Sequence, residues 1–498
     1  MEIWSNVLMG FQQVSQPINL LYCFIGVAMG TLIGVLPGIG PIATMSMLFP
    51  LAMAASPLAS IIMLAGIYYG AMYGGSTTSI LVNIPGEAAS VVTCIDGYQM
   101  ARKGRAGPAL GISAFGSFIG GTFSIIVLMY LVLPLSKIAI RMGPPEYLGF
   151  LAMGMTMVVY LSGRSILKGG IMAVVGLLLG CVGMDLVSGK SRFTLGIPYF
   201  DEGIDIAPMV MGLFGISEVL GNLVKPEERD IFKTRVSNLL PSLDDWRRST
   251  FPIIRGSVLG FFLGIVPGGG GVLASFLSYA TEKRISRHPE EFGKGAIEGV
   301  AGPETANNSA IGGAFIPLFA LGIPSNVVMA ILLASLMVHG VAPGAGFIAK
   351  NPELFWGVVA SMYIGNVMLV ILNLPLIGVW VKILKIPYRI LFPLILFFCV
   401  IGAYSINSRT FDVIVMVVFG VTGYVLKELD YEPAPLALAF VLGPMFELSF
   451  RQTMIIASHN LFFFFSRPIA LTALLIATLL ILSRFVSYLR KGGRKVGN

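Results

Sequence analysis

Two copies of one apolar motif, each interrupted by a Pro-Gly step, constrain this chain more than any other feature. The first copy spans residues 30–41 and the second spans residues 260–271, with glycines and proline at a constant offset of 230 positions (260 − 30 and 267 − 37). A helix break in an apolar segment frees backbone N–H and C=O groups, so it is tolerated only where it is buried in protein or lines a wet cavity. One such break in each half is typical of a transporter's central site.

Composition places the chain in a membrane. Of its 498 residues, 56% are hydrophobic and 12% are charged, whereas a soluble domain carries about 25% charged residues. The apolar runs are about 20 residues long, which suits membrane-spanning helices and not barrel strands. We expect about a dozen membrane segments, some of them broken. The four cysteines show no paired metal-ligand spacing and are interpreted as core residues.

The repeat extends along the chain and predicts two halves. Asn83-Ile84-Pro85 is echoed by Gly322-Ile323-Pro324 at an offset of 239 positions (324 − 85). We predict a first repeat over residues 1–235, a cytoplasmic linker over 225–250 and a second repeat over 251–498. The expected segments are a hairpin over 20–54, a broken helix over 58–98 and a scaffold over 109–224, followed by a hairpin over 252–281, a broken helix over 295–340, a scaffold over 354–466 and a C-terminal helix over 468–489.

Loop charge predicts that the two repeats are inverted. The loop after the first Pro-Gly segment is neutral (55–57) and its counterpart is basic (283–288), whereas after the Ile-Pro break the first loop is basic (102–105) and its counterpart nearly neutral (343–347). Basic loops stay cytoplasmic, so equivalent loops lie on opposite sides. Each Pro-Gly element is then a re-entrant hairpin with arms of roughly 10–15 residues, too short to cross a ~30 Å core singly. The predicted fold is an all-α integral membrane protein with two inverted-topology repeats.

The hairpin tips and the later breaks form the predicted substrate site. A half-helix N-terminus carries unpaired N–H groups and about +0.5 of a charge, so it can hold a carboxylate without a buried cation. The glycines before each tip are better explained by close helix packing. The predicted substrate-binding residues are Pro37, Gly38, Gly40 and Thr44 in the first hairpin, Pro267, Gly268 and Gly270 in the second, Asn83, Pro85 and Gly86 at the first break, and Pro324, Ser325 and Asn326 at the second.

Hydroxyl, amide and carboxylate groups crowd the segments before each break. Glu304, Asn307 and Asn308 are spaced i, i+3, i+4 and share one helical face. Such oxygens, with the carbonyls of unwound helices, suit sodium. The alternative is interhelical hydrogen bonding, worth under ~2 kcal/mol for each bond. The predicted cation-coupling residues, which would hold Na⁺, are Ser76, Thr77, Ser79, Glu304, Asn307 and Asn308.

Other ionisable residues favour no catalytic chemistry. Glu298, Asp96 and Glu87 are expected at the membrane interface as solvated carboxylates. The three histidines are far apart in sequence, and neither a zinc-protease motif nor a nucleophile elbow nor a Walker motif occurs. No cofactor is expected other than the coupling ion, Na⁺ or H⁺.

Five stretches carry a family resemblance together, although each alone is weak. They are Gly34-Val35-Leu36-Pro37-Gly38-Ile39-Gly40-Pro41, Tyr69-Gly70-Ala71-Met72-Tyr73-Gly74-Gly75-Ser76, Asn83-Ile84-Pro85-Gly86-Glu87, Pro303-Glu304-Thr305-Ala306-Asn307-Asn308 and Leu321-Gly322-Ile323-Pro324-Ser325. With them the chain resembles the large membrane subunit of the tripartite tricarboxylate transporter family (TctA-like) over essentially its full length. It departs from the family pattern at Ser458-His459-Asn460.

The resemblance implies a bacterial inner-membrane transporter that works with a small membrane subunit (TctB-like) and a periplasmic solute-binding protein (TctC-like). We therefore predict an ion-coupled secondary transporter that imports a tri- or dicarboxylate such as citrate, with Na⁺ favoured over H⁺ and a cytoplasmic C-terminus. The alternatives are a passive carboxylate channel, an intramembrane enzyme and a non-transporting scaffold subunit. No nucleic-acid partner is expected, because the basic residues gather in a few loops.

Overall fold

A computed structural model describes residues 2–36, 40–161, 165–185, 187–224, 238–268, 270–383, 388–458 and 460–494. Helices account for nearly all regular structure of these residues, and the strands described are two residues each, β1 (Gly183–Met184) and β2 (Ser191–Arg192). Six of the described helices are long and apolar enough to cross a membrane, and five shorter helices are also apolar. The predicted all-α membrane fold is confirmed.

The first half of the chain contains the elements before residue 225. In order they are α1 (Glu2–Val14), α2 (Pro17–Val35), α3 (Gly40–Met53), α4 (Pro57–Val82), the short η1 (Ala88–Ser90), α5 (Val91–Arg102), α6 (Ala106–Ile140), α7 (Pro144–Leu161), α8 (Ile166–Gly180), β1, β2, η2 (Pro198–Glu202), α9 (Ile206–Val210), the π-helical turn η3 (Met211–Ile216) and α10 (Ser217–Val224).

The second half begins with a helix that starts earlier than predicted. Its elements are α11 (Leu243–Ile265), α12 (Gly270–Ile285), η4 (Pro289–Glu291), α13 (Glu298–Leu321), α14 (Val327–Val338), α15 (Phe347–Lys350), α16 (Pro352–Asn373), α17 (Ile377–Ile383), α18 (Tyr388–Asn407), α19 (Thr410–Glu428), α20 (Pro433–Ile456), η5 (Leu461–Ser466) and α21 (Pro468–Arg494).

Part of the predicted linker is therefore helical. Ser242 caps α11, and its side chain and that of Asp245 accept each other's backbone N–H in a capping box. This Ser-x-x-Asp pattern marks a helix start despite the charge around it. Residues 225–237, the rest of the predicted linker, lie outside the described residues. The division into two repeats and a linker stays a prediction.

Proline and glycine separate the two arms of the second hairpin, and a glycine starts the second arm of the first. Val266 is extended (φ −77°, ψ 122°) because the following Pro267 disfavours the helical conformation. Gly268 and Gly270 then adopt φ of +79° and +50°, which other residues rarely do. Gly40 begins α3 in the same way, with φ of +59°. The arms α2 and α11 have 19 and 23 residues, so the predicted arm length was too short for both.

Each hairpin packs against the helix that follows it through equivalent close contacts, which we call a seam. A Cβ added to Gly34 on α2 would lie 2.3 Å from the carbonyl oxygen of Ala71 on α4, and one added to Gly264 on α11 would lie 2.0 Å from that of Ala310 on α13. The hairpin positions differ by 230 (264 − 34) and the helix positions by 239 (310 − 71). The same offsets relate the pairs Gly26–Met63 and Gly256–Gly302, and Gly30–Ile67 and Gly260–Ala306. Within each seam the residue numbers rise together, so each hairpin arm runs parallel to its helix.

Contacts between the halves show that the two helix pairs run antiparallel. Ser60, near the start of α4, hydrogen-bonds Ser335, near the end of α14, at 2.9 Å between hydroxyl oxygens. Ser76, further along α4, donates to Glu304, near the start of α13, at 2.5 Å. From Ser60 to Ser76, α4 thus rises about 24 Å, at 1.5 Å a residue, and the chain from Glu304 to Ser335 runs in the opposite direction. The two hairpins consequently enter from opposite ends of the molecule.

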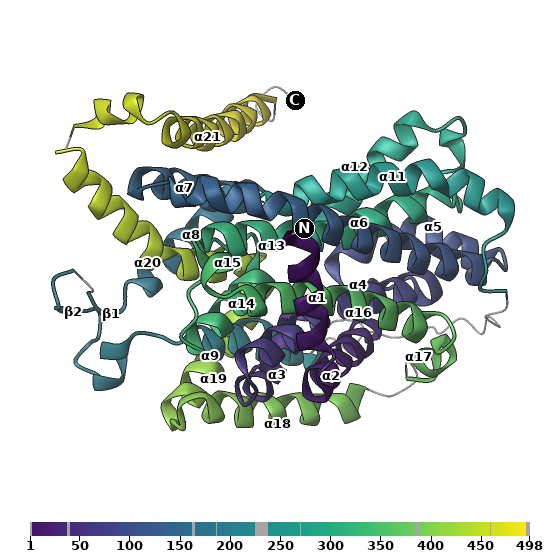
Figure 1. Ribbon diagram of the computed structural model, residues 1–498, viewed down its shortest axis with the longest axis horizontal. Coiled ribbons are helices and arrows are strands. Elements are labelled where there is room, and N and C mark those ends of the chain that lie inside the picture. The colour runs from purple at the N-terminus through teal and green to yellow at the C-terminus, as the bar shows by residue number, and fades with distance from the viewer. Residues whose placement is uncertain are drawn as a thin grey trace.

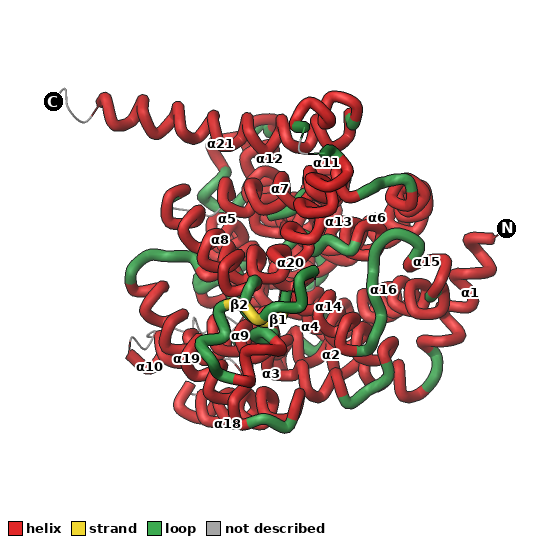
Figure 2. The backbone as a smooth tube through the Cα atoms, turned by 90° about the vertical axis from the view of Figure 1, so that its left-hand side faces the viewer, coloured by secondary structure: helices red, strands yellow, loops and turns green. Residues whose placement is uncertain are grey.

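The two ends differ in charge. At one end, which we call the basic end, Lys103 donates to the carbonyl of Lys294 at 2.6 Å, and Arg248 pairs with Glu291 at 2.5 Å. At the other end the ring of His339 hydrogen-bonds the carbonyl of Ala55 at 3.2 Å. In Figures 1 and 2, α11 and α12 lie toward the top, α2 and α3 toward the bottom, and α4 and α13 between them.

Candidate functional site

Several helix N-termini begin at the breaks in the middle of the molecule. The N–H of Gly268, in the second hairpin tip, donates to the carbonyl of Ser325 in the second break at 2.7 Å. A Cβ added to Gly271, in the first turn of α12, would lie 2.2 Å from Oδ1 of Asn307 and 3.5 Å from the Cβ of Ala89. The second hairpin tip therefore meets α13, the start of α14 and the first break of the other half.

Two side-chain pairs cross between the halves at this centre. The amide of Asn307 donates to Oε1 of Glu87 at 3.3 Å, and the amide of Asn326 donates to the hydroxyl of Tyr68 at 3.3 Å. The two pairs are equivalent, because Asn307 and Tyr68 differ by 239 positions and so do Asn326 and Glu87. Each half thus gives one residue of its α4 or α13 helix and one residue of its break, as in a two-fold interface.

Glu87 is buried, contrary to the interfacial position predicted for it. It is 7% exposed, and its Oε2 accepts the N–H of Ala89 at 2.8 Å, so its carboxylate caps the short helix that leads into α5. A carboxylate compensates the positive end of a helix, which accounts for its burial.

Asp96 is not a solvated carboxylate either, contrary to the prediction. Asp96 is fully buried because its carboxylate accepts the N–H groups of Gly293, Gly295 and Ala296 at 2.7–2.9 Å and the hydroxyl of Tyr279 at 2.8 Å. Glu298 lies at the basic end, where Nε of Arg248 donates to its carboxylate at 2.8 Å.

Glu304 lies in a cradle of hydroxyl groups. It is 1% exposed, and it accepts hydrogen bonds from Ser76 on α4 and Thr93 on α5. Asn307 and Asn308 stand on the same stretch of α13, but their side chains turn to Glu87 and to Ser117 on α6, at 3.3 and 2.8 Å. The predicted group of three therefore contacts three different partners and does not converge on one point.

Two of these amides keep a buried acceptor without a partner. Among the described residues, Oδ1 of Asn307 and Oδ1 of Asn308 have no hydrogen-bond partner, although the side chains are 1% and 3% exposed. A cavity of about 20 Å³ lies beside Asn308 and is also lined by Tyr69, Ser124 and Asn366. This volume is enough for one water-sized molecule or ion.

Comparison with known proteins identifies the family. The model of the tripartite tricarboxylate transporter TctA family matches residues 20–438. The chain belongs to this family.

Relatives of this TctA-family chain occur in Agrobacterium vitis and Methanocaldococcus jannaschii. The "Uncharacterized 52.8 kDa protein in TAR-I ttuC' 3'region" of A. vitis is 51% identical over 496 residues, 100% of this chain and 99% of the relative. The "Uncharacterized protein in TAR-II ttuC' 3'region" of the same species is 56% identical over 215 residues, 43% of this chain and 89% of the relative. An uncharacterized protein of M. jannaschii is 22% identical over 267 residues, 52% and 61% of the two chains. No solved structure matches the chain.

Several predicted hydroxyl ligands of this TctA-family chain bind their own helix. The hydroxyl of Thr44 donates to the carbonyl of Gly40 at 2.8 Å, and that of Ser79 donates to the carbonyl of Gly75 at 2.9 Å. Thr77 is buried in α4. These groups lie near the centre without joining Glu304, which Ser76 alone of the predicted hydroxyls contacts.

The first break is partly a packing element. Asn83 ends α4 in the left-handed conformation (φ 58°) and is exposed, and Pro85 is half-buried. Gly86 packs so tightly that an added Cβ would lie 2.0 Å from the carbonyl oxygen of Gly34. Pro37 and Gly38 lie outside the described residues. Of the first-half tip, Gly40 has open space beside it.

The second break is more enclosed than the first. Pro324 and Ser325 are buried, and the hydroxyl of Ser325 has no partner among the described residues. Pro267 is buried and packs against Gly154, 3.3 Å from an added Cβ. Asn326 caps α14 by accepting the N–H of Met329 at 3.0 Å.

Sequence reasoning missed four central residues. Tyr68 pairs with Asn326, Thr93 with Glu304 and Ser117 with Asn308, and Ser113 also hydrogen-bonds Glu304. The repeat offset of 239 applied to Asn307 would have found Tyr68. The other three lie in ordinary apolar helices, and nothing in their local sequence sets them apart.

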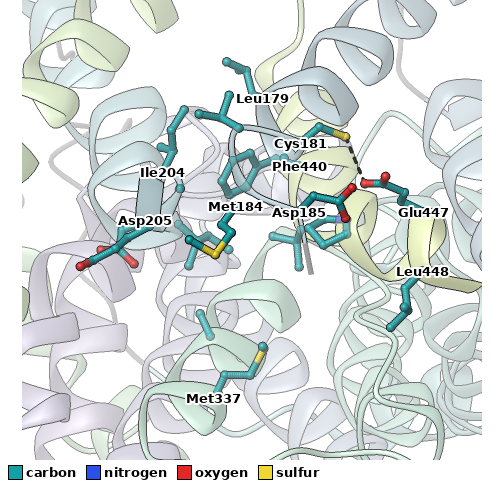
Figure 3. Close-up of a pocket in the computed structure, with 18 of the residues that line it drawn as sticks. Leu179, Cys181, Met184, Asp185, Ile204, Asp205, Met337, Phe440, Glu447 and Leu448 are labelled. Atoms are coloured by element: carbon teal, nitrogen blue, oxygen red, sulfur yellow. Dashed lines mark hydrogen bonds between the residues drawn. The ribbon is translucent and has the colours of Figure 1, made fainter. Parts of the chain in front are cut away.

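A larger cavity than the one beside Asn308 lies away from this centre, near the end of α14 (Figure 3). It has a volume of about 510 Å³ between β1, the end of α14 and α20, and Met184, Met337 and Phe440 line it. Its charges are paired: Arg192 donates to Glu447 at 2.7 Å and Arg451 to Asp185 at 3.0 Å. The N–H of Val187 holds the pKa of Asp185 well below its usual range. Because its cations are neutralised, this cavity is a poorer carboxylate site than the helix N-termini.

No group of three or more histidine, cysteine, aspartate or glutamate side chains within metal-binding reach occurs among the residues that the structure describes. Glu87, Asp96 and Glu304 are instead satisfied by hydroxyl, amide and backbone donors, whereas other buried acidic residues pair with arginines, as Glu282 does with Arg255.

Proposed function

We propose that this TctA-family protein is an ion-coupled secondary transporter that imports a tri- or dicarboxylate, such as citrate, across the bacterial inner membrane. The observation that carries the proposal is the convergence of the second hairpin tip with the start of α14 and the first break, between two antiparallel halves. Breaks at equivalent positions of two inverted halves are the arrangement in which secondary transporters bind substrate near the membrane midplane.

Helix N-termini at this centre suit a carboxylate. Each N-terminus offers free N–H groups and about +0.5 of a charge, which favours an anion in a site of low dielectric constant. Gly268 and Gly270 leave the backbone of the second tip uncovered by side chains. A carboxylate can therefore be held by main-chain donors and released again without breaking a strong ion pair.

The buried oxygens around α13 support cation coupling. Glu304 supplies a carboxylate, and Asn308 presents a free acceptor beside a cavity of about 20 Å³. Hydroxyl and amide oxygens are ligands that Na⁺ accepts, which favours Na⁺ over H⁺ as the coupling ion. In this scheme the ion binds near α13 and the substrate binds at the neighbouring N-termini.

Charge at the two ends supports an orientation. The basic end, with Lys103, Arg248 and Lys294, is the cytoplasmic side by the positive-inside rule. The His339 end then faces the periplasm, where a TctC-like solute-binding protein would deliver substrate. In this proposal a TctB-like small membrane subunit completes the assembly, and we expect the C-terminus on the cytoplasmic side.

Uptake in proteoliposomes tests the proposal. The full chain, with and without the two partner subunits, would be assayed with acetate, succinate and citrate under sodium, proton and null gradients. We expect uptake of citrate or succinate that requires a cation gradient and increases with the binding protein. Flux that ignores cation gradients would indicate a passive channel, and chemical conversion of the substrate would indicate an enzyme. The absence of any carboxylate flux from the complete assembly would contradict the proposal.

A further inference from the structure

Glu87 and Asn326 occupy the same place in the two repeats. They are 239 positions apart, and each follows the break after α4 or α13. Each caps the helix that starts there, which is the three-residue η1 before α5 for Glu87 and the 12-residue α14 for Asn326. Each also meets the other half through an equivalent partner, Asn307 for Glu87 and Tyr68 for Asn326. The two positions are therefore equivalent in the two repeats.

The two caps differ in their polar group. The N–H of Ala89, in the short helix η1 that leads into α5, is bound by the carboxylate of Glu87 at 2.8 Å. The N–H of Met329, at the start of α14, is bound by the neutral amide oxygen of Asn326 at 3.0 Å. A carboxylate compensates the partial positive charge of a helix N-terminus, and an amide does not. The positive end of the 12-residue α14 is therefore left without an anion from this cap.

A buried hydroxyl group beside α14 is open to a ligand. Ser325 precedes the cap, is fully buried, and its hydroxyl has no partner among the described residues. Gly270, which begins α12, has only Asn326 near it, with the amide nitrogen 4.0 Å from an added Cβ. Two helix N-termini and a free hydroxyl donor thus share one small region.

We propose that a carboxylate of the substrate binds at the N-terminus of α14, between Ser325, Asn326 and the first turn of α12, and that Glu87 is a tethered carboxylate filling the equivalent subsite of the first half. This inference rests on the proposed function, since it assigns the anion that the carrier moves to one of two equivalent places. The hydroxyl of Ser325, the amide of Asn326 and backbone N–H groups of α14 and α12 are the donors.

This assignment implies that the breaks provide one substrate subsite, instead of the two that the symmetry of the repeats would allow. Asn83, Pro85 and Gly86 in the first break then serve the tethered carboxylate of Glu87 and do not contact substrate. The further carboxylates of a di- or tricarboxylate bind elsewhere along the centre, so the number of carboxylates accepted is set outside the breaks.

Placing a tethered carboxylate on α14 tests the inference. Equilibrium binding of radiolabelled citrate, succinate and acetate to the purified full chain in nanodiscs would be compared for wild type, Asn326→Asp and Asn326→Ser. Aspartate caps a helix as well as asparagine does, so folding is preserved, whereas serine caps without charge. Two like charges in a partly buried site repel strongly enough that we expect Asn326→Asp to weaken binding about tenfold or more beyond Asn326→Ser.

The matched control is Ser56→Asp. Ser56 caps α4 at the His339 end, is exposed, and accepts the N–H of Ala59 at 3.3 Å, so this variant adds the same charged cap far from the centre. It is expected to bind the carboxylates like wild type. Thermal melting in the same nanodiscs checks that all variants fold.

The outcomes separate the two proposals. Weaker binding by Asn326→Asp than by Asn326→Ser, with Ser56→Asp unchanged, supports the subsite. Equal binding by wild type and Asn326→Asp, or equal loss in both Asn326 variants, overturns the subsite and leaves the carrier function standing. Failure of folded wild type to bind any of the three carboxylates overturns the proposed function itself.

Discussion

The two halves of the molecule share a backbone and differ in the polar groups that they bring to its centre. Hairpin and helix contacts recur at constant offsets, with a glycine of each arm against the same carbonyl of each helix. The pair Ser76–Glu304, however, has Phe315 and Ala65 at the equivalent positions, and both are buried and apolar. The contact between Ser76 and Glu304 therefore has no counterpart at the equivalent positions of the repeat. The comparison shows that the repeated contacts form the shared backbone, whereas the residues that differ between the halves determine where the carboxyl groups lie.

Loss of the unpaired carboxylate is expected to have the largest effect on transport. Glu304→Gln leaves the hydroxyls of Ser76 and Thr93 in place but replaces one carboxyl oxygen that they bind by an amide NH2 group, which cannot accept a hydrogen bond. An unsatisfied buried polar group costs about 1–3 kcal/mol, so cation-driven uptake should fall by about a hundredfold. Initial uptake rates in proteoliposomes measure this.

Glu290→Gln serves as the control for Glu304→Gln. Glu290 is exposed at the basic end, with 65% of its side-chain surface accessible. The Glu290→Gln variant should transport like wild type. Wild-type rates in Glu304→Gln would show that the break in symmetry at this position has no role in coupling.

Asn308→Ala is expected to reduce uptake by more than about tenfold while leaving membrane insertion intact. The change removes the donor to Ser117 and the free acceptor beside the small cavity, and an unsatisfied buried group costs about 1–3 kcal/mol. The equivalent residue of the first half is Tyr69, which lines the same cavity. The sodium dependence of uptake is the informative readout. An unchanged sodium requirement at a normal rate would remove Asn308 from the coupling site.

Gly34→Ala and Gly264→Ala should destabilise the protein to a similar extent. Each added methyl group meets a backbone carbonyl, at 2.3 and 2.0 Å, and overpacking of this kind costs about 1–3 kcal/mol. Gly170→Ala, where nothing lies within 4 Å, should be neutral or stabilising by up to about 1 kcal/mol. Thermal unfolding in detergent compares the three. A large difference between the first two variants would mean that the seams are not mechanically equivalent.

The helix ends before the breaks give the smallest expected effect. Asn83 and Gly322 both end their helix in the left-handed conformation, at φ of 58° and 71°. Asn83→Gly should change stability by only a few tenths of a kcal/mol, because both residues tolerate this conformation. Gly322→Asn should cost more, since an added Cβ lies 2.7 Å from the carbonyl oxygen of Pro343. Equal melting temperatures for the two exchanges would contradict this difference.

Much of the fold could be predicted from the sequence because breaks and loop charge act locally. The second Pro-Gly motif falls between α11 and α12, where the structure has its helix break, and the loops at 102–105 and 283–288 predicted that the two hairpins enter from opposite sides. The start of α11 was missed because charge density outweighed the Ser242–Asp245 capping signal.

The site could be predicted only in part. The sequence singled out Glu304, but its partners Ser76 and Thr93 come from two other helices, and such pairing depends on tertiary packing. The burial of Glu87 and Asp96 was unpredictable for the same reason: the backbone donors that satisfy Asp96 lie about 200 positions further along the chain.

The seams between hairpin and helix constrain how such a carrier can work. Because glycines bring main chain directly against main chain, α2 cannot slide along α4, nor α11 along α13, without collision. Each hairpin and its neighbour must travel as one rigid piece. A hairpin tip therefore cannot act as a small flap, and exposing the substrate first to one compartment and then to the other requires displacement of a whole hairpin–helix block against the rest of the protein.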